Sequence, residues 1–250
     1  MELSNNTILI TGGASGIGFA LAGALSKKGN KVLICGRRKD RLEKVKQSYP
    51  EIDFLQCDVT DKSQRIKLYE WATSYGALNF LINNAGIQRD YDFTKNNAKE
   101  YTAGENEIDV NLTAPIHLCE LFTPFLMKKA ESAILNISSS LGIIHMPIMP
   151  VYCATKAGMH AFSRCLREQL AGSNVKVFEA VPPAVESELN PERRAVSTLK
   201  TYVPAAEYAD FVIRGLETDT YEIYAPIVES LQNKTLKEVY EYILVPTNPR

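Results

Sequence analysis

A tyrosine and a lysine, Tyr152 and Lys156, stand four residues apart in a stretch whose pattern predicts a helix. Residues at this spacing share one face of a helix, so a phenol and an amine would lie side by side. A nearby ammonium stabilises the phenolate and lowers its pKa from about 10, at about 1.4 kcal/mol per unit. Such a tyrosine can act as an acid or a base near neutral pH, although the same spacing also describes an ordinary surface pair.

Three hydroxyls, those of Ser138, Ser139 and Ser140, close a predicted strand that begins at Ala133. Successive side chains of a strand point to opposite faces, so we expect Ser139 to point away from its two neighbours. One hydroxyl could donate a hydrogen bond to a substrate oxygen. All three could instead satisfy backbone groups in a turn.

The segment Thr11–Gly18 reads TGGASGIG and follows a predicted apolar strand, Thr7–Ile10. Glycines at positions 12, 16 and 18 allow a sharp turn and a close backbone approach to a ligand. The free N–H groups of the loop and of the following helix suit a pyrophosphate. The spacing GxxxGxG differs from the GxGxxG fingerprint, and a tight connection between strand and helix is the alternative. The position directly after the first strand favours a nucleotide.

The second predicted strand, Lys31–Cys35, ends in Gly36-Arg37-Arg38 and carries no acidic residue. An NAD enzyme usually places Asp or Glu here to accept a hydrogen bond from the ribose 2′-hydroxyl. Guanidinium groups instead suit a 2′-phosphate, so Arg37 and Arg38 favour NADP over NAD. The alternative is a solvated helix start, where cations are slightly unfavourable.

Two further strand ends carry polar residues. Asp58, followed by Val59, comes after a strand at 54–57, and its carboxylate could accept from an adenine amino group or cap a local turn or the next helix. Asn83-Asn84-Ala85-Gly86 follows a strand at 78–82, at the edge of the sheet where ligands of such folds bind. Its amides can hold strands together while its backbone lines a cofactor.

The scaffold for these residues is an alternation of apolar strands and helical patterns. Further strands are predicted at 133–138, at 175–181 and near Ile223, and helices at 38–49, 61–75, 97–129 (partly broken), 151–170 and 205–216. Apolar strands separated by helices predict an α/β fold with a doubly wound, mostly parallel, Rossmann-like sheet covered on both faces. We find no linker or repeat, so residues 1–250 are expected to form a single domain.

The composition of the 250 residues excludes several classes of protein. The 28 Lys and Arg balance 29 Asp and Glu, for a net charge of -1, which gives no general attraction to nucleic acid or an anionic membrane. The five cysteines form no CxxC pair and the three histidines lack ligand spacing, so we expect reduced thiols, a cytoplasmic protein and no metal site. The N-terminus lacks a signal-peptide pattern, and no apolar run approaches the roughly 18 residues of a membrane span.

Together these motifs resemble those of the short-chain dehydrogenase/reductase family, from about Thr7 to Ser187. The matching pieces are TGGASGIG, CDV, NNAG, Asn111, the serine run, YCATK and the segment at Pro182, in the family's order. Asn111 to Ser139 spans 28 residues, Ser139 to Tyr152 spans 13 and Tyr152 to Lys156 spans 4. These spacings match the family's Asn–Ser–Tyr–Lys tetrad and select Ser139 among the serines. PPAVES and YCATKAG also resemble a bacterial subgroup named after the D-alanine–lipoteichoic-acid operon.

The resemblance implies a role for each matching residue. Tyr152 would be the general acid in reduction and the base in oxidation, and Ser139 would hydrogen-bond the substrate oxygen. Lys156 would bind the nicotinamide ribose and lower the pKa of Tyr152. Asn111 would kink its helix and hold a water in a proton relay, and Val185 would meet the carboxamide. The motifs and the resemblance assign cofactor contacts to Gly12, Ser15, Gly16, Ile17, Gly18, Arg37, Arg38, Asp58, Val59, Asn84, Ala85, Gly86, Tyr152, Lys156 and Val185.

The sequence departs from the family pattern in two places. Pro183 stands where the family usually has glycine, and it fixes φ and removes an N–H, so we expect a stiffer loop beside the nicotinamide. The polar segment 91–107 does not match the family. Residues 186–204 are expected to form a substrate lid, the mostly apolar segment 145–150 to line a pocket, and 227–250 to form a helix and a polar end.

The expected function is therefore an NADP-dependent oxidoreductase acting on a small carbonyl/alcohol substrate. An NADP-binding regulatory or partner protein with little catalysis, or an isomerase or dehydratase using bound NADP, remains an alternative. The family packs dimers or tetramers through its long helices, so a homodimer or homotetramer is expected. The apolar residues on these helices could equally fill the monomer core; they are Leu118, Leu121, Phe122, Phe162 and Leu166.

Overall fold

The computed structural model describes residues 1–95, 106–189, 202–232 and 238. In this part of the chain the strands form one parallel sheet in the order β3-β2-β1-β4-β5-β6-β7. The predicted α/β, doubly wound, Rossmann-like class is confirmed. The strands are β1 (Thr7–Thr11), β2 (Lys31–Gly36), β3 (Asp53–Gln56), β4 (Leu78–Asn83), β5 (Ser132–Ile137), β6 (Val175–Val181) and β7 (Glu222–Tyr224).

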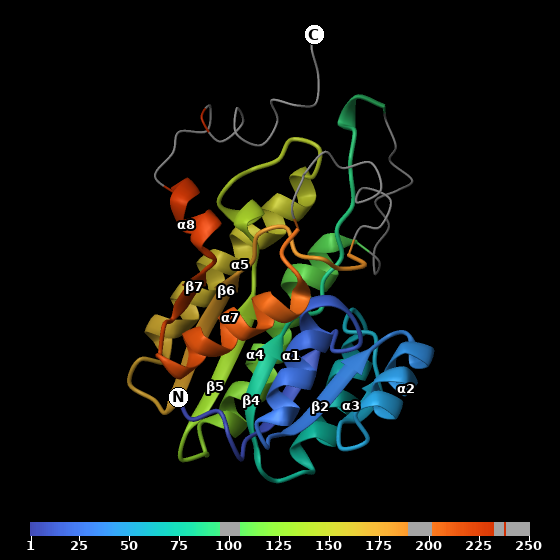
Figure 1. Cartoon of the computed structure of the whole chain (residues 1–250), viewed down its shortest axis with the longest axis vertical. Helices are drawn as coiled ribbons and strands as arrows, with labels where there is room; N and C mark the ends of the chain where they lie inside the picture. The colour runs from blue at the N-terminus through green and yellow to red at the C-terminus, as the bar shows by residue number, and fades with distance from the viewer. Residues whose placement is uncertain (96–105, 190–201, 233–237, 239–250) are drawn as a thin grey trace.

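Helices cover both faces of the sheet (Figure 1). On one face lie α1 (Gly16–Lys27), α2 (Lys39–Ser48) and α7 (Ala205–Glu217). On the other lie α3 (Lys62–Thr73), α4 (Ala114–Leu126) and α5 (Pro150–Gln169). Short elements complete the described chain: η1 (Phe93–Lys95), the π-helical turn η3 (Asp109–Thr113), η4 (Ser140–Gly142) and α8 (Pro226–Gln232).

The apolar strands are explained by burial on both sides. Along β1, Ile8 and Ile10 pack with α1 and α7, while Leu9 between them packs with α4 on the opposite face, and all three are fully buried. A strand covered on two faces needs apolar residues at every position rather than at alternate ones. Because the strands all run parallel, their carboxyl ends lie at one edge of the sheet, where the predicted site residues follow them.

One sequence-based prediction differs from the structure at the site. Strand β5 ends at Ile137, so the serine run lies beyond the strand and strand alternation does not govern it. The break expected in the helical region 97–129 is confirmed in its described part, because the π-helical turn η3 interrupts it before α4 begins. The first residues of this region, 97–105, lie outside the described residues, as do 190–201 of the expected lid and most of the tail from 233 onward.

The described residues lack two kinds of feature. None of their helices combines the length and apolarity that a membrane crossing requires. No group of three or more His, Cys, Asp or Glu side chains within the described ranges is arranged to hold a metal ion.

Candidate active site

A cavity of about 600 Å³ opens at the carboxyl ends of the strands, where the strand order turns from β1 to β4. This switch point is where open α/β sheets bind ligands. Most of the predicted site residues line the cavity: Gly12, Ser15, Gly16, Ile17, Arg37, Arg38, Asp58, Val59, Asn84, Ala85, Gly86, Ser139, Tyr152, Lys156 and Val185. Gly18 and Asn111 do not line the cavity, but they contact or adjoin residues that do.

The glycine loop is fastened to the end of β4 by an amide. Asn84 Nδ2 donates to the carbonyl oxygens of Thr11 at 2.9 Å and Gly12 at 3.2 Å. Gly12 has a φ of +66°, which only glycine adopts readily, and a Cβ there would lie 2.9 Å from Ala85 Cα. A Cβ at Gly18 would stand 2.3 Å from Asn84 Nδ2. The close approach of loop and strand therefore requires these two glycines.

Asp58 has the turn-forming role that the sequence left open. Its Oδ1 accepts from the backbone N–H of Thr60 at 2.9 Å and from the Thr60 hydroxyl at 2.8 Å. The cap of the following helix is Asp61, whose side chain accepts from Ser63 N and Gln64 N. Asp58 also lines the cavity, so the turn presents its carboxylate at the site.

Tyr152, Ser139 and Lys156 come together on the cavity wall. Ser139 begins η4, and its Oγ accepts from Leu141 N at 3.1 Å while the residue lines the cavity. Its neighbours Ser138 and Ser140 line the same cavity. The chain leaves the strand at Ile137, so the pleat that would alternate the three side chains ends there, and the expected alternation stays a prediction.

Burial is the main influence on the protonation of Tyr152 and Lys156. Burial raises the pKa of Tyr152, and a hydrogen bond with Ser139 opposes the rise. Burial lowers the pKa of Lys156 to about 8, and the charge of Glu179 opposes that change. Lys156 Nζ donates to Ile137 O at 2.9 Å and lies 5.6 Å from the centre of the Tyr152 ring. Burial is thus the largest influence on the pKa of Tyr152 in this geometry, because a buried phenolate is costly, and the lowering of that pKa by Lys156 stays a prediction.

Asn111 links three segments from behind the cavity. It lies in the π-helical turn η3, which interrupts the helix at this point. Its side chain accepts from Ile87 N at 2.9 Å and donates to Ile87 O at 2.8 Å, and it also donates to Thr155 Oγ1 at 3.2 Å. Asn111 thus joins the chain after β4 to helix α5, three residues from Tyr152.

Glu107 is a buried carboxyl behind the cavity lining whose charge acts on Tyr152, and the sequence reasoning missed it. It is fully buried, and its Oε1 accepts from Arg89 N at 2.9 Å. Burial raises its pKa to about 7, and its charge in turn raises the pKa of Tyr152. The available signal was its spacing of four residues before Asn111, in a segment that otherwise departs from the family pattern.

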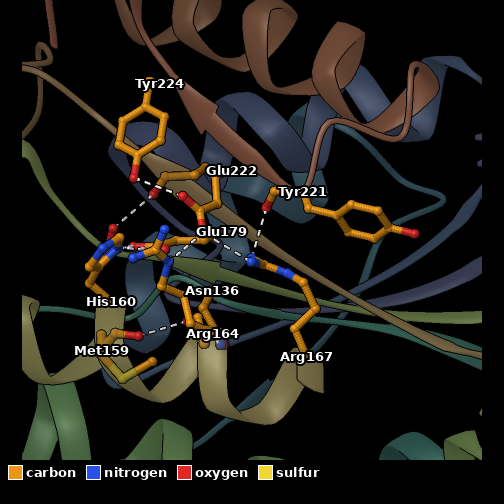
Figure 2. A network of polar contacts seen from close by, with 12 residues as sticks. Asn136, Met159, His160, Arg164, Arg167, Glu179, Tyr221, Glu222 and Tyr224 are labelled. Carbon is orange, nitrogen blue, oxygen red and sulfur yellow. Dashed lines mark hydrogen bonds and ion pairs between the residues drawn. The ribbon is translucent and has the colours of Figure 1, made fainter. Parts of the chain in front are cut away.

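Beneath α5 a row of polar residues crosses the sheet at one register. Asn136 of β5 is aligned with Glu179 of β6, and Glu179 with Glu222 of β7. The ring of His160 faces Glu179, with Nδ1 2.9 Å and 3.1 Å from its two carboxylate oxygens, and this contact raises the pKa of His160 (Figure 2). Arg167 pairs with Glu222 at 3.0 Å. The helix that carries Tyr152 and Lys156 is thus fixed to three strands by polar contacts.

Apolar side chains lie beside Tyr152 in the cavity wall. Met146 and Met149, from the segment expected to line a pocket, do so, and His145 does not. Both methionines pack in one apolar cluster with Tyr152 and Leu141. Val185 forms a bridge with Val203, and both residues line the cavity. Further apolar residues of the lining include Ile144, Leu189, Ile227 and Val228.

The chain matches a known protein family and curated relatives over most of its length. The family described as short chain dehydrogenase matches residues 6–197. An uncharacterized oxidoreductase, DltE, of Bacillus subtilis (strain 168) is 47% identical over 238 residues, which cover 94% of each chain. The 3-oxoacyl-[acyl-carrier-protein] reductase FabG of Thermotoga maritima is 30% identical over 215 residues, 83% of this chain and 86% of that one.

Solved structures share the whole fold. A short-chain dehydrogenase from Sphingobium yanoikuyae in complex with NADPH superposes with a TM-score of 0.82 at 25% identity, covering 98% of this chain and 96% of that one. A short-chain dehydrogenase/reductase from Burkholderia phymatum in complex with NAD gives a TM-score of 0.84 at 20% identity, covering 100% and 99%. The second likeness concerns the fold alone.

Proposed function

The chain belongs to the short-chain dehydrogenase family and is a nicotinamide-dependent oxidoreductase, and from this premise we propose that it moves hydride between NADP and a carbonyl/alcohol substrate with Tyr152 as the general acid/base. One observation carries the proposal. Tyr152, Ser139 and Lys156 line the same cavity as the glycine loop and the arginines that follow β2. The proposed acid/base residues and the proposed dinucleotide site thus lie in the same cavity.

The residues of the cavity fit a dinucleotide. Gly12 and Gly16 both have positive φ, and α1 begins at Gly16, so the loop offers backbone N–H groups and a helix N-terminus to a pyrophosphate. A Cβ at Gly12 would collide with Ala85, so the loop takes this shape beside the end of β4 only with glycine there. A bound nicotinamide supplies or accepts the hydride.

The protein residues handle the proton. In reduction Tyr152 donates its phenolic proton to the oxygen that develops negative charge, and in oxidation the phenolate accepts a proton from the alcohol. Ser139 hydrogen-bonds the same oxygen and orients it. Lys156, held by Ile137 O, contributes positive charge near the phenol, which favours the phenolate at the moment it forms.

The preference for NADP is supported by the end of β2. Arg37 and Arg38 line the cavity, and no acidic residue lies between Lys31 and Arg38 to accept from a ribose 2′-hydroxyl. Replacing Arg37 by Ala should weaken NADP binding about tenfold and NAD binding little, since a charged contact to the 2′-phosphate is lost. Equal weakening of both cofactors, measured by titration calorimetry, would refute the assignment.

The substrate class follows from the apolar residues beside Tyr152. Leu141, Met146 and Met149 pack around it and offer no charged partner, so we propose a carbonyl compound with an apolar portion. The reductase name of the Thermotoga maritima relative supports carbonyl reduction as the direction to assay first.

Tyr152→Phe tests the mechanism. The variant keeps the ring and its packing but cannot transfer a proton, so turnover should fall by about 10²- to 10⁴-fold while the dissociation constant of NADPH stays within about twofold. Unchanged turnover would refute the assigned acid. Cofactor binding without hydride transfer over a broad carbonyl panel would favour the regulatory protein, and conversion without net cofactor consumption would favour the isomerase or dehydratase.

The oligomer and the compartment stay predictions. Leu118 and Phe122 of α4 are buried in the core, so these two residues give no support for a dimer contact. Light scattering of the purified chain tests for a homodimer or homotetramer. The five cysteines are all free thiols, which is consistent with the reducing environment of a cytoplasm.

A further inference from the structure

One carboxylate, that of Glu188, bridges two guanidinium groups at the mouth of the cavity. Its Oε2 accepts from Arg38 Nη1 at 3.1 Å, and its Oε1 lies 3.0 Å from Arg41 Nη1. The other terminal nitrogen of Arg38 donates to Ser15 Oγ at 3.2 Å. Arg38, Ser15 and Glu188 all line the cavity. An anion therefore already occupies the guanidinium group that the proposed function assigns to a cofactor phosphate.

The position of Glu188 is fixed by the segment that carries it. Val185 forms a bridge with Val203, supported by hydrogen bonds from Glu186 N to Val203 O at 2.9 Å and from Val203 N to Ala184 O at 3.0 Å. Two residues on, Ser187 Cβ lies only 3.0 Å from the place where a Cβ on Gly16 would stand. The chain thus crosses directly over the glycine loop before it reaches Arg38, and Glu188 is held at the rim of the cofactor site.

We propose that Glu188 determines cofactor selectivity by competing with the 2′-phosphate of NADP for Arg38 and Arg41. This inference rests on the proposed function and adds a residue that lies about 150 positions from the arginines in the sequence. A 2′-phosphate carries more negative charge than a carboxylate and accepts more hydrogen bonds, so it can displace Glu188 from the guanidinium groups. The ribose of NAD has only a hydroxyl at this place and gains little by such a displacement.

The exposure of the three side chains makes the exchange feasible. Arg38 is 52% exposed, Glu188 44% and Arg41 38%, so water screens the ion pairs and can solvate the released carboxylate. A buried pair would resist exchange because its freed partner would be left without solvation. Displacement of Glu188 also releases the side-chain contact that holds the 184–189 segment to the arginines, so cofactor type and the position of this segment are coupled.

The test is the affinity of the full chain for NADPH and NADH, measured by titration calorimetry, in wild type and Glu188→Gln. Removal of the competing charge should tighten NADPH binding about fivefold and leave NADH within about twofold, since an exposed ion pair is worth at most about that factor. The matched control is Glu43→Gln on α2. It makes the same charge change next to an exposed partner, Lys39 at 3.6 Å, but does not line the cavity, and it should alter neither affinity.

A second pair of variants isolates the contact. In an Arg38→Ala background, Glu188→Gln should change NADPH affinity less than it does in wild type, because Arg38 is one of the two groups for which the anions compete. Equal tightening for both nucleotides, no change in either, or weaker NADH binding in Glu188→Gln would overturn the inference and leave the proposed function standing. Failure of both wild type and Glu188→Gln to bind either nucleotide would overturn the proposed function and this inference with it.

Discussion

Charged side chains are used in opposite ways beneath helix α5 and at the rim of the cofactor site. Beneath α5, Glu179 is fully buried and faces His160, and Lys156 is nearly buried and donates to the backbone oxygen of Ile137. At the rim, Arg38 and Glu188 are about half exposed and pair directly with each other. Figure 2 shows the contact of His160 with Glu179 in the first region.

The difference between the two regions lies in what burial does to a charge. A buried group cannot exchange its partner cheaply, so its environment fixes its protonation, as for Lys156 with its pKa of about 8. An exposed group keeps access to water and can trade one anion for another at little cost. Proton transfer needs the first condition, and the entry and exit of a charged cofactor need the second.

Among the changes in the buried region, Lys156→Met should have the largest effect on activity. It removes the positive charge near Tyr152, and we expect turnover to fall by about 10²- to 10⁴-fold, the usual value of positioned acid–base catalysis. We expect no loss of thermal stability at pH 7, because burial disfavours the ammonium that is removed. Steady-state assays and thermal melts check the two parts, and a variant with near-normal turnover would show that the charge is not required.

Glu107→Gln tests whether a second buried carboxyl makes the stability depend on pH. The folded pKa of about 7 exceeds the ordinary value of 4.5, so the unfolded chain releases the proton first and stability falls as pH rises from about 4.5 to 7. A shift of that size amounts to about 3 kcal/mol. Urea melts at pH 5 and pH 8 should show this fall in wild type and little of it in Glu107→Gln. An equal fall in both proteins would assign it to other groups.

Glu179→Gln removes the carboxylate that His160 faces. We expect the free energy of unfolding to drop by about 1–3 kcal/mol, the cost of losing a hydrogen bond to a charged group. The raised pKa of His160 gives stability that is fully present below about pH 6.5 and is lost as pH rises through the folded value. The variant should therefore lose less stability above pH 6.5 than wild type does, and NMR titration of the ring should return its pKa toward the ordinary value.

Arg41→Ala should have the smallest effect on the fold. Arg41 is 38% exposed and pairs with the half-exposed Glu188, so the change in unfolding free energy should stay within about 0.5 kcal/mol. A loss above about 2 kcal/mol in urea melts would show that the rim is a structural element like the row beneath α5. Lys39→Ala, which removes another exposed cation of α2, is the matched control.

The sequence predicted the sheet and most residues of the cavity, because both follow from local patterns. Two-sided burial leaves apolar runs such as 78–82, and cavity residues of parallel sheets follow strand ends, as Arg37 and Asn84 show. The serine run lines the cavity as expected, but the strand stops one residue earlier than predicted, because pairing with the neighbouring strands sets where a strand ends. Glu107 was missed because burial of a carboxyl depends on tertiary packing, and its spacing of four residues from Asn111 does not reveal it.

What the amino-acid order determined by itself was the set of chemical groups at each strand end: glycines after β1, arginines after β2, and a phenol and an amine one helical turn apart. What only the tertiary structure decided was the environment of those groups. Burial has the largest influence on the pKa of Tyr152 and raises it, and Glu188 reaches Arg38 across about 150 residues of chain. Solvation and long-range contact depend on how distant segments pack, and neither is encoded in the spacing of adjacent residues.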